Sequence, residues 1–255
     1  FCRLCDNIAD GDLPLEKKRS ELAGLKALVS QSLTPGNAEI TDEVPHEFVA
    51  LADASAAFGI PVRYYEEVID GVESDLSKTR FDDFEELRAY CYGVASVVGL
   101  ICIEVFGYDD PAAKQHAIDM GLAMQLTNIL RDVKEDAELD RIYIPADEMG
   151  RFGYSEEDLK AGVSNDAFRS LMAHQVERAH GYYDSSERLF SMLSAESRAC
   201  PKVLHAAYKA ILTRIEASDF DVYSRRIGLS TAEKLMITAR LWAGSLLPRV
   251  PMPRR

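Results

Sequence analysis

Residues 118–136 read IDMGLAMQLTNILRDVKED, the most informative segment of the chain for its fold. Drawn as a helix, it is apolar around almost its whole circumference, which is typical of a helix buried in a protein core. Four polar side chains nevertheless share roughly a quarter of the circumference: Gln125, Asn128, Asp132 and Asp136. Two amides and two carboxylates in a core carry a desolvation cost that something must offset. A bound metal ion or a network of ion pairs could do so.

The rest of the chain predicts an all-α protein. Helical periodicity dominates, strand signals are weak, and no repeat or linker divides the 255 residues. The predicted helices span residues 1–9, 15–31, 47–58, 62–77, 81–106, 111–135, 165–193, 201–223 and 231–246. Residues 138–154 are expected to form a loop, and residues 155–158 resemble a capping box. We therefore predict a single helical-bundle domain over residues 1–255.

Charge and cysteine usage exclude several classes of function. The net charge is −13, which argues against nucleic acid as a partner. A phosphorylated substrate would need local arginines and a divalent metal rather than overall attraction. The five cysteines have no framework spacing, and Cys2-x-x-Cys5 has no second pair to complete a zinc site. We therefore expect free thiols and a cytoplasmic protein.

The chain shows no segment long enough to be predicted as a transmembrane helix. The longest apolar run, residues 94–103, falls well short of the ~20 residues that a membrane span requires. Residues 240–255 mix Trp242, leucines and arginines and could rest on a membrane surface, although a packed helix with a basic tail is the favoured interpretation. Because Phe1 lies within an apparent helix, we expect an N-terminally truncated product.

A second pair of aspartates lies at the start of the chain, in residues 1–10, FCRLCDNIAD. Asp6 and Asp10 are one helical turn apart, and Arg3 precedes them on the same face. Aspartate pairs on two facing helices would form an oxygen-rich site of the kind that magnesium and phosphates occupy. The chain has 42 acidic residues, so such pairs also arise by chance. The polar stripe on a buried helix is the stronger signal.

Four motifs together resemble the squalene/phytoene synthase family of head-to-head prenyltransferases. They are FCRLCDNIAD (1–10), YYEEVIDGVESDL (64–76), YCYGVASVVGL (90–100) and QLTNILRDVKEDAELDRIYIP (125–145). Within the family, these motifs are most similar to those of the bacterial branch that makes presqualene diphosphate for hopanoids. The resemblance extends over essentially the whole chain. It implies an isoprenoid-synthase-type helical bundle with a central cavity.

The resemblance also implies roles for individual residues. The implied metal ligands are Asp6, Asp10, Asn128, Asp132 and Asp136, with Mg²⁺ as the ion and Mn²⁺ as an alternative. The implied substrate-binding residues are Arg3, Tyr90, Gln125, Asn128, Arg141, Tyr143, Tyr208 and Arg225. The implied catalytic residues are the four aspartates with Arg3 and Tyr143. One departure is Asn7, where the family commonly has a second aspartate.

The implied reaction joins two prenyl diphosphates, with farnesyl diphosphate as the expected substrate. Metal-bound diphosphate leaves, and an allylic carbocation forms in an apolar tunnel for which Val94, Val97, Val98 and Leu122 are candidate walls. The product is presqualene diphosphate or squalene, and the use of NADPH stays open. One alternative is a phytoene synthase that uses geranylgeranyl diphosphate, and another is a non-catalytic assembly factor. A terpene cyclase or a chain-elongating enzyme is disfavoured by the R-x-Y-I-P sequence at 141–145.

Overall fold

The computed structural model describes residues 1–33 and 45–246, with side chains up to Leu241. The secondary structure of these residues is helical, apart from an isolated bridge between Tyr108 and Leu193. The prediction of an all-α protein is therefore confirmed.

The described part of the chain contains these helices in order. The first half of the chain contains α1 (Cys2–Asp10), α2 (Leu15–Leu33), α3 (His46–Phe58), α4 (Val62–Asp75), α5 (Phe84–Cys91), the π-helix η1 (Tyr92–Ser96) and α6 (Val97–Phe106). The second half contains α7 (Ala113–Arg131), α8 (Val133–Glu138), α9 (Ala146–Phe152), α10 (Glu156–Lys160), α11 (Asp166–Ser186), α12 (Leu189–Met192), α13 (Ala199–Ala217) and α14 (Thr231–Leu246). Helices α5, η1 and α6 run on without a break and form one long helix.

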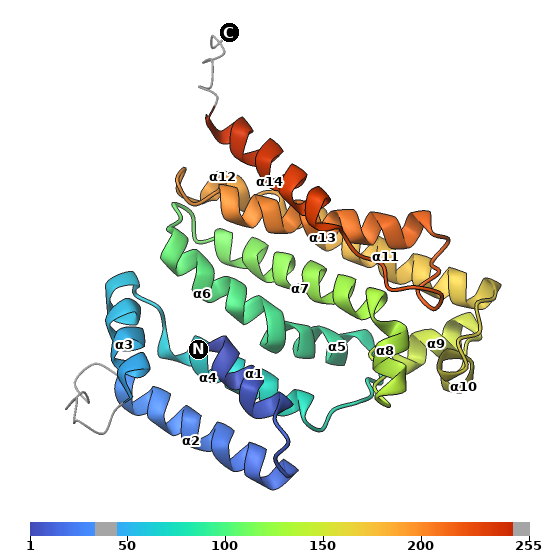
Figure 1. Ribbon diagram of the computed structural model, residues 1–255, viewed down its shortest axis with the longest axis horizontal. Coiled ribbons are helices and arrows are strands. Elements are labelled where there is room, and N and C mark those ends of the chain that lie inside the picture. Colours follow the sequence, from blue (N-terminus) through green and yellow to red (C-terminus); the bar gives the residue numbers. More distant parts are fainter. Residues whose placement is uncertain (34–44, 247–255) are drawn as a thin grey trace.

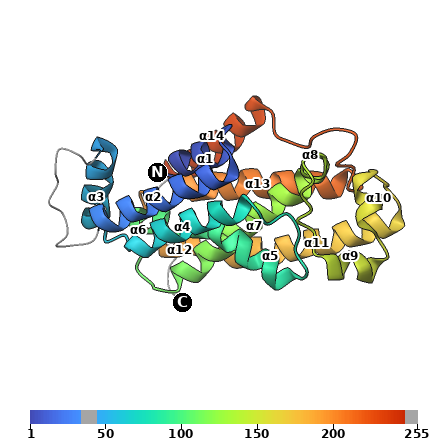
Figure 2. The same ribbon diagram turned by 90° about the horizontal axis from the view of Figure 1, so that it is seen from below.

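Helix α7 occupies the centre of the bundle. It packs against α5, η1 and α6 on one side and against α11 and α13 on the other (Figure 1). Helices α1–α4 cover the outer side of the long α5–α6 helix, and α14 leans on α13. Helices α8, α9 and α10 gather at one end of the molecule, as both views show (Figure 2). The predicted polar stripe therefore lies on the most enclosed helix of the fold.

The sequence of α7 explains its central position. Its apolar and small side chains are buried on several faces, as predicted: Ala117, Met120, Leu122, Ala123, Leu126, Ile129 and Leu130. Ile118 packs against both apolar clusters of the core, one formed largely by α2, α4 and α6 and the other by the end of α7 with α11 and α13. Burial of each leucine, isoleucine or methionine among them contributes about 1.5–3 kcal/mol.

The π-helix η1 lies where three helices approach one another most closely. A Cβ atom on Gly121 of α7 would lie 2.5 Å from the Cα atom of Ser96. On the other side, a Cβ atom on Gly71 of α4 would lie 2.6 Å from the carbonyl carbon of Gly93. The Ser96 hydroxyl donates a hydrogen bond to the Ile118 carbonyl at 2.8 Å. Backbone contact on both sides thus holds the long helix between α4 and α7.

Several of the predicted helix bounds are wrong. The helix predicted for 201–223 ends at Ala217, because Asp219 and Phe220 take left-handed backbone conformations. The helix predicted for 165–193 is divided into α11 and α12. The helix predicted for 111–135 ends at Arg131, because Asp132 takes φ −102° and ψ 18° and separates α7 from α8. The loop predicted for 138–154 contains α9, which Pro145 precedes and which Gly153 ends in a left-handed conformation. The capping box at Ser155 is confirmed, since the Ser155 side chain accepts a hydrogen bond from the Asp158 amide.

The prediction about membrane segments also needs correction. The continuous helix over 84–106 is 23 residues long, and its most apolar 18-residue stretch has a mean hydropathy of 1.8, so by length and composition it could cross a membrane. The sequence count considered only the run at 94–103 and missed its extension through α5. In the structure this helix packs against α4 and α7, as a core helix does, so the finding is weak support for a membrane span. The predicted membrane contact of 240–255 involves side chains that lie almost entirely outside the described residues.

A buried ion pair fixes α9 to α11. The Glu148 side chain accepts hydrogen bonds from Arg178 Nη1 at 2.9 Å and from Gln175 Nε2 at 2.5 Å. The Arg178 guanidinium also lies 3.8 Å from the centroid of the Phe84 ring. Burial alone would raise the pKa of Glu148, but hydrogen bonds from Arg178 and Gln175 lower it to about 2. Since α9 directly follows residues 141–145, this pair holds the end of that segment in place.

Replacing Glu148 by Gln should lower the free energy of unfolding by about 3–5 kcal/mol, because it leaves the charge of Arg178 buried without a counter-ion. Glu156→Gln is the control, since Glu156 pairs with Arg80 and Lys160 at the surface and its removal should cost at most about 1 kcal/mol. Urea denaturation of the three proteins measures both effects. Equal losses in the two variants would contradict the assignment.

The Glu148 contribution should also depend on pH. Because its folded-state pKa lies below the ordinary value of 4.5, its stabilisation is complete above that pH and is lost as the pH falls towards 2. The difference in stability between the wild type and Glu148→Gln should therefore shrink between about pH 5 and about pH 2. A difference that stays constant over this range would refute the pKa assignment.

Replacing Gly121 by Ala should destabilise the fold by about 1–3 kcal/mol, because the added methyl group would collide with the Ser96 backbone. Gly24→Ala in α2 is the matched control, since a Cβ atom there meets nothing within 4 Å. That substitution should be neutral or stabilise by up to about 1 kcal/mol, in line with helix propensity. Thermal unfolding of both variants gives the comparison, and a stable Gly121→Ala protein would show that η1 is not in tight contact with α7.

Candidate functional site

The predicted carboxylates Asp132 and Asp136 lie at the junction of α7 and α8. Asp132 ends the first helix and begins the second. Its amide donates to the Asn128 carbonyl at 2.9 Å, and the Asp136 amide donates to the Asp132 carbonyl at 2.8 Å. The helical hydrogen-bond pattern therefore continues through the junction. Asn128, Asp132 and Asp136 therefore keep the one-turn spacing of a helix, although the helix predicted to carry them is interrupted at Asp132.

Asp132 is held between two arginines. Its Oδ1 atom accepts hydrogen bonds from Arg131 Nε at 2.8 Å and from Arg226 Nε at 2.9 Å. A second nitrogen of Arg131 pairs with the Oδ2 atom. Burial alone would raise the pKa of Asp132, but the two guanidiniums outweigh it and lower the pKa. Asp132 is therefore ionised, and Arg131 and Arg226 are its counter-ions.

Asp136 has a different electrostatic environment. Its burial, and then the negative charge of Asp132, raise its pKa to about 7, while Arg141 acts in the opposite direction. Asp136 and Arg141 line the same small cavity, of about 10 Å³, together with Tyr143. The two aspartates thus repel each other, as the spacing predicts, and only one of them has a close arginine partner.

Two buried oxygen atoms near these carboxylates have no hydrogen-bond partner in the part of the chain that the structure describes. They are Asn128 Oδ1 and Glu135 Oε2. The amide nitrogen of Asn128 donates to Gln125 Oε1 at 3.3 Å, so the predicted amide pair is in contact. Buried acceptors without donors are rare and need a reason. The Asn128 oxygen and the Asp132 and Asp136 carboxylates are hard oxygen donors, a residue set of the kind that fits a divalent cation such as Mg²⁺.

Asp75, at the end of α4, organises a second polar group that includes predicted residues. Its Oδ1 atom accepts hydrogen bonds from the hydroxyls of Tyr90 at 2.7 Å and Tyr143 at 3.1 Å. Arg141 lies 3.5 Å from Asp75 Oδ2. Tyr90, Arg141 and Tyr143, which are far apart in the sequence, thus converge on one carboxylate. Asp75 was not among the predicted site residues.

The two tyrosines are buried and stay neutral at ordinary pH. Burial and then Asp75 raise the pKa of Tyr90, and burial raises the pKa of Tyr143 to about 12. Their ring centroids are 5.3 Å apart, and both rings pack against Phe81, at 5.2 Å and 5.7 Å. The site therefore combines oriented phenols with aromatic faces close to charged groups.

The first aspartate pair remains separate in this structure. Arg3, Asp6 and Asp10 are exposed on α1 and make no side-chain hydrogen bond or ion pair with any other described residue. Among the described residues, no three Asp, Glu, His or Cys side chains lie close enough together to hold one metal ion. Magnesium commonly uses one or two carboxylates with substrate phosphates and water, so two separate pairs remain compatible with it. The role of the first pair stays a prediction.

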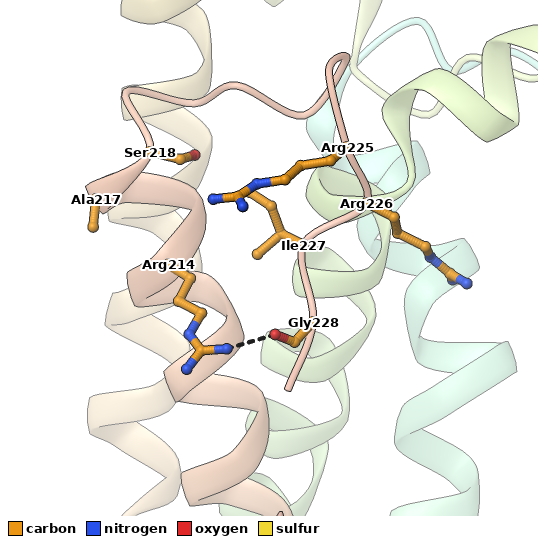
Figure 3. Close-up of a pocket in the computed structure, with 7 residues that line it drawn as sticks. All are labelled: Arg214, Ala217, Ser218, Arg225, Arg226, Ile227 and Gly228. Atoms are coloured by element: carbon orange, nitrogen blue, oxygen red, sulfur yellow. Dashed lines mark hydrogen bonds between the residues drawn. The ribbon is translucent and has the colours of Figure 1, made fainter. Parts of the chain in front are cut away.

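The C-terminal arginine that reaches the site is Arg226, next to the predicted Arg225. Arg226 contacts Asp132 and lies 3.8 Å from Glu135, whereas Arg225 points towards the end of α13 (Figure 3). The predicted Tyr208, on α13, lies close enough to Arg131 to contribute to its raised pKa, after the larger effect of the hydrogen bond to Asp132.

Sequence reasoning thus missed Asp75, Arg131 and Arg226. Asp75 belongs to a quoted motif, YYEEVIDGVESDL, and an aspartate at the end of a helix that precedes Tyr90 was an available signal. The two arginines adjoin predicted residues, and only the direction of each side chain in the fold distinguishes them from their neighbours.

The predicted tunnel walls separate into two kinds. Val97 and Leu122 are buried in the two apolar clusters, which matches ordinary core packing. Val94 and Val98 are only partly buried, and each packs at the edge of a cluster. The latter two are the better candidates for contact with an apolar substrate.

Comparison with known proteins decides the family. The family described as squalene/phytoene synthase matches residues 1–233. The chain belongs to the squalene/phytoene synthase family. The polar groups around Asp132 and Asp75 are thus the candidate active site of a member of this family.

Curated relatives within the family are named phytoene synthases. The 15-cis-phytoene synthase of Synechocystis sp. is 40% identical over 206 residues, which cover 76% of this chain and 61% of the relative. Phytoene synthase 2 of Solanum lycopersicum is 34% identical over 260 residues, which cover 97% of this chain and 80% of the relative. The chain therefore spans about three fifths of the length of the Synechocystis protein.

Solved structures support the same fold. Squalene synthase HpnC from Alicyclobacillus acidocaldarius matches with a TM-score of 0.79 and 26% identity, over 86% of this chain and 80% of that protein. A dehydrosqualene synthase solved with a ligand matches with a TM-score of 0.82 and 23% identity, over 95% of this chain and 83% of that protein. The isoprenoid-synthase-type helical bundle predicted from the sequence is thus confirmed.

Replacing Asp136 by Asn should stabilise the metal-free protein at high pH. Because the folded-state pKa of Asp136 is about 7, above its ordinary value of 3.8, ionisation of this group weakens the fold as the pH rises through 7. The gain in unfolding free energy for Asp136→Asn should therefore be largest near about pH 8 and vanish near about pH 4. Urea denaturation over this range, with a chelator present, measures it.

The exposed residue Asp140 supplies the control for this experiment. Its pKa is lowered, chiefly by hydrogen bonds from Lys160 and Arg80, so Asp140→Asn should give no gain at high pH. If both variants showed the same pH dependence, the Asp136 pKa would not be the cause.

Proposed function

We propose that this protein condenses two prenyl diphosphates head to head, with release of diphosphate. The observation that carries the proposal is the group of unsatisfied oxygens and paired charges at the α7–α8 junction, in a chain that belongs to this family. A site that buries carboxylates beside arginines, next to neutral tyrosines, suits a reaction in which a diphosphate leaves and a carbocation forms.

Asp132, Asp136 and Asn128 would hold Mg²⁺ or Mn²⁺, together with Asp6 and Asp10 from α1. When bound, the ion would neutralise the charge that develops on the leaving diphosphate. Two observations support this donor set. Asn128 Oδ1 has no hydrogen-bond partner among the described residues, and the Asp132 and Asp136 carboxylates repel each other. The use of NADPH, which the sequence leaves open, concerns only the reduction to squalene.

The arginines would bind and orient the diphosphate groups. Arg131 and Arg226 already lie at Asp132, and Arg141 lies between Asp75 and Asp136. Guanidiniums bind phosphate oxygens in pairs, which gives both affinity and orientation. Arg3, exposed on α1, could serve a second diphosphate. Together these residues supply locally the positive charge that the chain lacks overall.

Tyr90 and Tyr143 would face the reacting prenyl groups. Their raised pKa values keep them neutral, so their rings can stabilise a nearby carbocation by roughly 0.5–2 kcal/mol each. Asp75 orients both hydroxyls through its Oδ1 atom. Asp75 is therefore proposed as a positioning residue that acts through the two tyrosines.

The similar proteins support two candidate substrates, which are prenyl diphosphates of different chain length. The curated relatives named phytoene synthases favour geranylgeranyl diphosphate, and the similarity to a squalene synthase structure keeps farnesyl diphosphate as the second candidate. The assembly-factor alternative is less favoured, because all four predicted metal carboxylates are present.

Product analysis tests the reaction. The protein is incubated with Mg²⁺ and either geranylgeranyl or farnesyl diphosphate, with and without NADPH, and the products are identified by mass spectrometry. We expect a head-to-head product of twice the substrate chain length. A cyclic terpene or a longer linear diphosphate would contradict the proposal.

Replacing Asp132 by Ala should reduce kcat by roughly 10²–10³, the range observed when one group that stabilises a developing anion is lost. Glu138→Gln is the matched control, since Glu138 is an exposed acid on α8 and should be replaceable without loss. Steady-state kinetics with the better substrate give the comparison. Full activity in Asp132→Ala would instead favour the non-catalytic alternative.

A further inference from the structure

A second pocket, separate from the aspartate residues, lies between the end of α13 and the segment 225–228. Its volume is about 380 Å³, within the range of small-molecule sites. Figure 3 shows Arg225 directed into it from one wall and Arg214 from another. The remaining lining residues are Ala217, Ser218, Arg226, Ile227 and Gly228.

The charge of this pocket is opposite to that of the chain. Three arginines line it, and none of its lining residues is acidic, although the protein has a net charge of −13. The pocket between α4 and η1, of about 410 Å³, has the excess of acid expected of this chain, with Glu67, Asp70 and Glu86 against Lys78. A local concentration of arginine in an acidic protein creates a site for an anion that would otherwise be repelled.

The three arginines are not equally available to a ligand. Arg214 donates to the Gly228 carbonyl at 2.6 Å and pairs with Glu233, and Arg226 pairs with Asp132. Arg225 makes no hydrogen bond or ion pair with any residue in the described part of the chain. Its guanidinium thus keeps all its donors for a ligand.

The position of the pocket indicates what the ligand is. Arg225 and Arg226 are adjacent, and their side chains diverge, one into the pocket and the other onto Asp132 (Figure 3). An anion in the pocket is therefore one residue along the backbone from the proposed site of diphosphate release. Planar guanidiniums bind the oxygens of phosphate groups in pairs.

We propose that the pocket formed by Arg214, Arg225 and Ser218 binds inorganic diphosphate, as a site for the released product distinct from the substrate site. The inference rests on the proposed function for the source of the anion. Because Arg226 joins this segment to Asp132, diphosphate in the pocket should weaken binding of the next substrate, and the enzyme should be inhibited by this product.

Calorimetric titration of inorganic diphosphate into the full chain, with a chelator present, tests the pocket without metal or prenyl substrate. Arg225→Gln should weaken binding by at least about tenfold, since it removes a charged hydrogen-bond donor. Ala217→Glu should have a similar effect by adding an acid to the pocket without removing an arginine. Arg188→Gln, at an exposed arginine near α12, is the control and should bind diphosphate as the wild type does.

The outcomes separate the inference from its alternatives. If the wild type does not bind diphosphate, or if Arg225→Gln binds it within about twofold of the wild type, the inference is overturned. The alternative role for Arg225 is to neutralise the partial negative charge at the end of α13. In that case Arg225→Gln would lower thermal stability and leave diphosphate binding unchanged.

Steady-state kinetics distinguish a separate diphosphate site from the substrate site. If Arg225→Gln raises the KM of the prenyl diphosphate as much as it weakens binding of free diphosphate, the arginine belongs to the substrate site and the inference fails. If it relieves product inhibition with little change in KM, the inference is supported. Diphosphate binding that depends on Arg225, in a protein that forms no head-to-head product, would overturn the proposed function alone.

Discussion

The structure depends on one constraint, the burial of two like-charged carboxylates one helical turn apart at the α7–α8 junction. Asp132 and Asp136 repel each other where solvent screening is weak, and burial opposes the charge on both. The surrounding parts of the fold offset this cost unequally. Arg131 and Arg226 hold Asp132 as an anion, while Asp136 is left with a pKa of about 7. A bound cation would offset the repulsion between the two carboxylates that remains.

This constraint accounts for several features that otherwise look unrelated. The segment after α13 returns across the bundle so that Arg226 reaches Asp132, and residues 141–143 turn back so that Arg141 and Tyr143 meet Asp75. The buried Glu148–Arg178 pair fixes the end of that second segment. The close contacts at Gly71 and Gly121 hold α4 and α7 against the long helix that carries Tyr90. Packing far from the aspartates thus sets the geometry around them.

The central helix was predictable because its pattern leaves few alternatives. A helix that is apolar on nearly every side must be enclosed, so its polar stripe had to face a polar site. Resemblance to the motifs of the family then predicted Tyr90, Arg141 and Tyr143 as site residues, and the structure brings these three residues together at Asp75. The sequence does not predict helix α9, because proline and glycine are typical of loops, whereas here Pro145 precedes the helix and Gly150 lies inside it. Asp75 was missed because its role depends on Tyr90 and Tyr143, which only the packing of the helices brings to it.

Sequence alone predicts the helical class and the buried helix with its polar stripe. These properties follow from periodicity and from the cost of burying charge, both of which are local. Only the tertiary structure decided that Asp75 joins two distant tyrosines, that Arg226 rather than Arg225 contacts Asp132, and that Arg225 faces a separate pocket. The direction of a side chain depends on how helices far apart in the chain pack together, and a one-residue difference reverses it.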